Sequence, residues 1–139
     1  MRGEGSADPS GAVIDLFKAD RTTTRPDHPI AITRNPRRIR VFFGGRVVAD
    51  SARALTLKEA RYPFVQYIPR EDADMSAFSR TAHRTHCPYK GDASYFTLSV
   101  GDRRAENAVW SYEQPFPAMA QIAGHLAFYP DRVDAIEEE

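Results

Sequence analysis

Short apolar stretches alternate with polar positions along most of the chain, in the two-residue period of β-strands. The clearest case covers residues 39–43 and 46–49, which flank Gly44-Gly45. A two-glycine turn between such runs is typical of a hairpin, because both central residues of a type I′ turn need positive φ. The pattern therefore predicts a β-hairpin at the start of the folded region.

Further runs extend this pattern to the end of the chain. Gly101-Asp102 predicts the turn of a second hairpin, whereas residues 70–86 show no clear period and are interpreted as a long loop. Pro117 at a first helical position and Gly124 just past the end predict a short helix over residues 117–123. The other predicted strands cover residues 64–68, 93–100, 104–112, 125–129 and 133–136, while residues 54–57 fit either a strand or a helix.

About seven strands with one short helix indicate an all-β domain, either barrel-like or a small two-sheet architecture. Residues 36–139 are predicted to form this single domain. Residues 1–35 are rich in glycine and proline and poor in large apolar side chains, which predicts a partly disordered tail or arm. Within that arm, residues 12–17 fit either a helical turn or a docking strand.

Charge and composition narrow the classes of function. Nineteen basic and nineteen acidic residues cancel, and a pI near 6.9 argues against a protein that coats nucleic acid. The single cysteine excludes an intrachain disulfide and a four-cysteine zinc site, and it favours a reducing, cytoplasmic setting. Neither a signal peptide nor a membrane span is predicted. We predict no metal and no cofactor; a homo-oligomer is compatible with the sequence.

The candidate chemistry centres on Cys87, which lies in Thr85-His86-Cys87-Pro88-Tyr89-Lys90-Gly91. Pro88 favours extended backbone at Cys87, so the adjacent His86 should point to the opposite face. Lys90 is better placed to lower the pKa of the thiol, because a nearby cation favours thiolate. The alternative is that Cys87 is a small buried apolar residue.

The second predicted hairpin contributes a carboxylate between aromatic rings. A two-residue turn would place Thr97 opposite Glu106, Tyr95 opposite Ala108 and Ala93 opposite Trp110. One face would then carry Tyr95, Thr97, Glu106, Trp110 and Tyr112. A carboxylate in such surroundings can act as a general acid or base, or can anchor an amino group of a ligand. A three-residue turn would make the same positions a core face, and core packing is the simpler role for Trp110.

Polar residues also follow the predicted strand at residues 64–68. Tyr67 ends that strand, and Arg70 has the planar fork that binds a carboxylate or phosphate. Asp72 and Asp74 have the spacing of a magnesium-binding pair, but acids after a proline are more often turn-formers or helix caps.

Several stretches together resemble the bacterial family catalogued as domain of unknown function 427, over residues 40–137. They are Val47-Val48-Ala49-Asp50, Tyr67-Ile68-Pro69-Arg70-Glu71-Asp72, Thr85 to Tyr95, Glu106 to Tyr112 and Ile122 to Tyr129. The resemblance implies an all-β fold of the β-tent kind, also used by Yippee proteins and methionine sulfoxide reductase B, and no settled activity. Those relatives carry two zinc-binding cysteine pairs, which this chain lacks. The family also bears a nucleotidyltransferase-like label, but such enzymes need paired acids after a glycine turn, and only Asp50 follows Gly44-Gly45.

Two functions are compatible with these residues, and neither requires that the protein be an enzyme. The first is a pocket for a small anionic metabolite, with Cys87, Lys90 and Glu106 as reacting groups and Tyr67, Arg70, Tyr95, Trp110 and Tyr112 as walls. The second is a non-catalytic interaction module in which the arginine-rich residues 34–40 and the exposed hairpin contact a protein or nucleic acid. A redox thiol protein would need glutathione or a second subunit, because no resolving cysteine is present.

Overall fold

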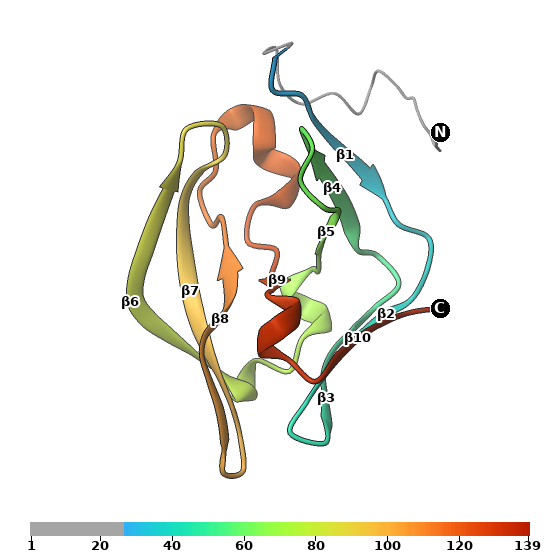
Figure 1. The fold of residues 1–139 in the computed structure, drawn as a ribbon, viewed down its shortest axis with the longest axis vertical. Coiled ribbons are helices and arrows are strands. Elements are labelled where there is room, and N and C mark those ends of the chain that lie inside the picture. The colour runs from blue at the N-terminus through green and yellow to red at the C-terminus, as the bar shows by residue number, and fades with distance from the viewer. Residues whose placement is uncertain (1–26) are drawn as a thin grey trace. The chain divides into compact units, whose positions relative to one another are not determined.

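A computed structural model describes residues 27–139, and its strands confirm the all-β class (Figure 1). The interpretation of residues 12–17 lies outside the described residues. Two compact units are found within the described part, one formed by residues 27–35 and 55–66 and the other by residues 36–54 and 67–139.

The first unit is built around a three-stranded sheet in the order β1-β4-β5. Its strands are β1 (Ile30–Arg34), β4 (Leu55–Glu59) and β5 (Val65–Tyr67), the last of which ends in the second unit. Ile32 pairs with Leu57, and both side chains are buried. The strand alternative for residues 54–57 is therefore correct. Strand β1 lies within residues 1–35, the range that the sequence assigns to the arm.

The second unit contains two antiparallel sheets, in the orders β10-β2-β3 and β6-β7-β8-β9. In Figure 1 the long strands β6, β7 and β8 lie side by side. The strands are β2 (Ile39–Phe43), β3 (Arg46–Ser51), β6 (Phe78–Cys87), β7 (Gly91–Val100), β8 (Arg103–Ser111), β9 (Ala127–Phe128) and β10 (Ala135–Glu138). With the sheet of the first unit, the described residues form three sheets and no closed barrel, so the all-β prediction holds with one sheet more than expected.

A single apolar cluster joins the two sheets of the second unit. It combines Ile39 and Val41 of β2 with Phe96 and Leu98 of β7 and Val109 of β8, all of them buried. Burial of such side chains stabilises a fold by roughly 1.5–3 kcal/mol each. The predicted two-glycine turn is present between β2 and β3, with φ of 62° at Gly44 and 77° at Gly45. The apolar cluster covers one face of the β6–β9 sheet, and the candidate site lies on the opposite face.

One prediction about local structure is wrong, and a second is correct in position but not in the regularity of its helix. The expected loop over residues 70–86 contains the ten-residue strand β6, which was missed because it is an edge strand with most side chains exposed and so shows no buried period. The expected helix over residues 117–123 is a 3₁₀ segment, η4 (Pro117–Ile122), interrupted by non-helical backbone at Met119. Its proline start and the positive φ of Gly124 agree with the prediction. The remaining 3₁₀ turns are η2 (Arg70–Asp72), η3 (Met75–Ala77) and η5 (Pro130–Arg132).

Within residues 27–139, none of the helical segments has the length and apolar character needed to cross a membrane.

Candidate functional site

An aromatic row lies on one face of the β6–β9 sheet. Tyr95 of β7 and Trp110 of β8 are directly paired and so point to the same side. The Trp110 indole nitrogen donates to the Tyr67 hydroxyl at 3.2 Å, and the Tyr67 ring lies 6.5 Å from that of Tyr112. At the other end the Trp110 ring is 4.5 Å from that of Tyr129. Four predicted wall residues are therefore brought together on one face.

A bulge in β8 sets the register of this face. Two pairs, Leu98 with Ala105 and Phe96 with Val109, show that β8 advances four positions while β7 advances two. The two-residue turn is as predicted, but Tyr95 pairs with Trp110 instead of Ala108 because β8 contains two extra residues. Asn107 lies in the bulge with φ of 53°, a left-handed conformation that asparagine tolerates better than most residues. The apolar-polar alternation of β8 does not reveal these extra residues; only the polar pair Glu106-Asn107 marks their position.

The bulge opens a pocket of about 270 Å³ on the second unit. Residues from three strands and the loop after β9 line it: His83, Tyr95, Glu106, Asn107, Tyr129 and Arg132. Four of the six side chains end in a hydroxyl, amide or guanidinium group, and the other two in an imidazole and a carboxylate. A concave group of hydrogen-bonding side chains beside aromatic rings is the usual composition of a small-molecule site.

Phenol and imidazole rings form one wall of the pocket. The Tyr95 hydroxyl lies 3.0 Å from Thr85 Oγ1 and 3.5 Å from the Tyr129 hydroxyl, and the His83 ring packs on the edge of Tyr95 at 4.5 Å. Burial, together with the Tyr95 hydroxyl, raises the pKa of Tyr129 to about 12. Tyr129 is therefore a neutral hydrogen-bonding group at physiological pH.

Of the three predicted reacting residues, only Glu106 lines the pocket. Cys87 pairs with Gly91 at the opposite end of the β6–β7 hairpin, and the half-buried thiol belongs to a turn whose last residue is Lys90. Seven positions of β7 separate Gly91 from Leu98, which lies beside the bulge, and at ~3.4 Å per residue this is more than 20 Å. The structure thus does not bring Cys87 and Lys90 together with Glu106, because the hairpin turn and the bulge are at different ends of the same strand.

Lys90 nevertheless lies at the far end of the same aromatic row. Its side chain is buried, with the residue only 6% exposed, and Nζ lies 5.7 Å from the centroid of the Tyr112 ring. A cation over an aromatic face is a stabilising contact when it is shielded from water. Lys90 is therefore held in place by packing, and its part in chemistry, like that of Cys87, stays a prediction.

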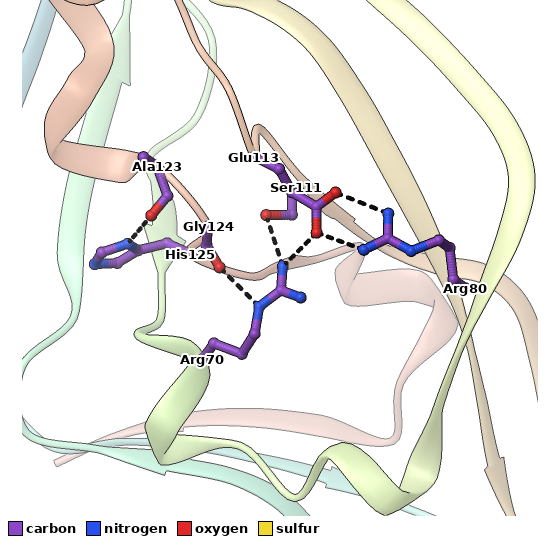
Figure 2. A network of polar contacts seen from close by, with 7 residues as sticks. All are labelled: Arg70, Arg80, Ser111, Glu113, Ala123, Gly124 and His125. Atoms are coloured by element: carbon purple, nitrogen blue, oxygen red, sulfur yellow. Dashed lines mark hydrogen bonds and ion pairs between the residues drawn. The ribbon is translucent and has the colours of Figure 1, made fainter.

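Arg70 belongs to a different cluster, shown in Figure 2. Its guanidinium donates to the Gly124 carbonyl at 3.1 Å, to Ser111 Oγ at 3.3 Å and to the Glu113 carboxylate at 3.0 Å. Arg80 completes the cluster by donating twice to Glu113, at 2.7 Å each. The hydrogen bonds of Arg80 hold the pKa of Glu113 at about 2, well below its ordinary 4.5. This cluster, here called the arginine clamp, ties η2, β6 and the loop after β8 to one carboxylate.

The two acids after β5 are engaged in local contacts. Asp72 accepts from Ser51 Oγ at 2.7 Å and from Arg53, and its pKa is lowered first by the Arg53 hydrogen bond. Asp74 caps η3 by accepting from the Ser76 amide, and it pairs with Arg46. The cap interpretation is confirmed for Asp74, whereas Asp72 lies in the turn η2 with its side chain bound to Ser51 and Arg53. Among residues 27–139 no group of three or more metal-ligating side chains is found.

Sequence reasoning missed four of the six pocket residues: His83, Asn107, Tyr129 and Arg132. His83 was hidden in the range interpreted as a loop, and Arg132 lies in the η5 turn after a proline. A weak signal did exist at Glu106-Asn107, because two polar residues with poor strand propensity stand between Ala105 and the apolar run Ala108-Val109-Trp110. Reading that pair as a bulge would have predicted the altered register.

Fold and site together define a small all-β domain with a polar pocket beside a strand bulge. The family described as "Domain of unknown function (DUF427)" matches residues 31–139, and the chain belongs to this family. The resemblance noted from the sequence is thus confirmed, over a slightly longer range. No curated protein matches the chain.

Proposed function

We propose that this domain binds a small metabolite with an acidic group in the pocket beside the β8 bulge. The observation that carries the proposal is the convergence of Arg132, Asn107 and Tyr129, each a hydrogen-bond donor, around about 270 Å³ of space. The guanidinium supplies a fork that matches a carboxylate or phosphate, and the neutral phenol donates without adding negative charge. Such convergence is the recurrent pattern of ligand sites.

The alternative of a basic interaction surface along residues 34–40 receives less support. Arg38 donates twice to Asp50, at 2.8 and 2.7 Å, and Arg40 is paired with Glu139. Paired charges attract a phosphate backbone less than unpaired ones do. The pocket is therefore the stronger candidate.

The test is ligand-observed NMR with a panel of small carboxylates and phosphate monoesters at 0.1 M salt or below. We expect saturable binding of at least one panel member, and a loss of about tenfold or more in affinity in Arg132→Gln, because a charge-assisted pair is replaced. The control is Arg104→Gln, an exposed arginine on the same strand as the bulge. Absence of saturable binding, or binding that is the same in Arg132→Gln as in the control, would overturn the proposal.

A further inference from the structure

Among residues 27–139 the Glu106 carboxylate has no hydrogen-bond or ion-pair partner, although Arg132 contacts the backbone of the same residue. Arg132 Nη1 donates to the backbone carbonyl of Glu106 at 2.6 Å, and no hydrogen bond or ion pair joins the two side-chain charges within residues 27–139. Elsewhere in the second unit arginines engage carboxylates directly, as Arg38 does with Asp50 and Arg103 with Asp134. The backbone contact fixes the position of Arg132 while leaving its remaining nitrogens, and the Glu106 carboxylate, able to bind other groups.

Asn107 is oriented for donation. Thr81 Oγ1 lies 2.7 Å from Asn107 Oδ1, so the amide oxygen is the atom engaged by the protein. The backbone of Asn107 is held by its own amide, which donates to Thr97 Oγ1 at 3.2 Å. The side-chain NH₂ group makes no hydrogen bond to the described residues and can donate to an acceptor in the pocket. The pocket therefore offers one negative group and several donors.

The size of the pocket indicates how much of a ligand it can hold. At ~30 Å³ per water molecule, about 270 Å³ corresponds to roughly nine waters, which suits a molecule of about ten non-hydrogen atoms. A nucleoside triphosphate is several times larger. A single guanidinium also matches the two oxygens of one carboxylate better than it matches a polyphosphate.

We infer that the ligand of this pocket is an amino acid or a close analogue, whose carboxylate is bound by Arg132 and Asn107 and whose ammonium group is bound by Glu106. The inference rests on the proposed function and narrows it. Two opposite charges on one rim, neither neutralising the other, are complementary to a zwitterion. A ligand with only an acidic group would leave Glu106 as a nearby repulsive charge. Tyr95 and Tyr129 then contact the apolar part of the ligand.

The test compares matched ligands that differ only in the amino group. Each common amino acid is measured by ligand-observed NMR beside its des-amino acid, for example phenylalanine beside 3-phenylpropionate. We expect at least one amino acid to bind about tenfold more tightly than its des-amino partner, the equivalent of one charge-assisted contact. In Glu106→Gln that difference should shrink to about twofold or less, whereas Glu137→Gln, an exposed matched change on β10, should leave it intact.

The outcomes separate the two proposals. Equal binding of both members of every pair, with dependence on Arg132, would overturn the zwitterion inference and leave an acid-binding pocket in place. Preference for the amino acid that survives Glu106→Gln would also overturn the inference. Binding of no amino acid, no des-amino acid and no member of the acid panel would overturn the proposed function itself.

Discussion

The arginine clamp and the pocket contain the same kinds of charged group but use them in opposite ways. In the clamp, both oxygens of Glu113 accept hydrogen bonds from arginines, and the pKa of the acid is held at about 2. In the pocket, Arg132 contacts the backbone carbonyl of Glu106, and the Glu106 carboxylate has no partner in the described part of the chain. The difference indicates that a carboxylate saturated by protein donors serves the fold, whereas one left unpaired beside a guanidinium can serve a ligand.

The stabilising role of the arginine clamp is tested most directly by removing the Glu113 carboxylate. In Glu113→Ala, Arg70 and Arg80 lose their shared acceptor and face each other as like charges, while Ser111 and Gly124 are too few to compensate. We expect the free energy of unfolding to fall by about 2 kcal/mol, between the values for exposed and buried pairs. Urea denaturation followed by tryptophan fluorescence would measure it. A change below about 0.5 kcal/mol would show that the clamp does not stabilise the domain.

Acid should weaken the clamp in a defined pH range. The pKa of Glu113 is about 2 in the folded protein and near 4.5 when unfolded, so between these values the unfolded state binds more protons. Its stabilising contribution is complete above about pH 5 and is lost as the pH falls toward 2, by an amount on the order of 2 kcal/mol. Urea denaturation at pH 6, 4 and 3 would measure this loss of unfolding free energy. Glu113→Gln should have a shallower dependence over that range; an unchanged slope would contradict the assignment.

Asn107 has two roles, a left-handed backbone in the bulge and a side-chain amide in the pocket, and a pair of variants can separate them. Asn107→Gly keeps the left-handed backbone at φ of 53° but removes the amide, whereas Asn107→Ala also strains the backbone. We expect Asn107→Ala to lower stability by about 1 kcal/mol and Asn107→Gly to lower it less. Both should weaken binding of a carboxylate probe. Equal stability of the two variants in thermal unfolding would contradict the argument from the bulge.

The smallest effect on stability is expected at Glu106 itself. Its carboxylate makes no hydrogen bond or ion pair within the described residues, so Glu106→Gln should change the free energy of unfolding by less than about 0.5 kcal/mol. The same substitution at Glu113 removes the charge from a saturated cluster and should cost more. Chemical denaturation of the two variants in parallel provides the comparison. A larger loss at Glu106 would mean that the pocket acid is structural.

Local patterns predicted the elements that have a buried side, such as the β2–β3 hairpin with its two glycines and the β7–β8 hairpin with its two-residue turn. They failed for β6, because an exposed edge strand has no periodic apolar face. Alternation did predict that Tyr95, Trp110 and Tyr112 share one face, because residues two positions apart in a strand point to the same side. The pocket could not be predicted, because it depends on two extra residues in β8 and on a loop residue, Arg132, whose neighbours in space are far away in sequence.

Because of the bulge in β8, the residues that form the pocket lie outside the packing that stabilises the domain. Leu98 and Val109, on either side of it, pair in regular ladder positions and are fully buried, so the interruption is confined to the stretch opposite Thr97. Excising Glu106 and Asn107 would restore an uninterrupted ladder without shifting either flank to the other side of the sheet, because the deletion is an even number of residues. The pocket therefore depends on two residues that the core does not need. Deleting or replacing them would give a domain with the same core and a different binding surface.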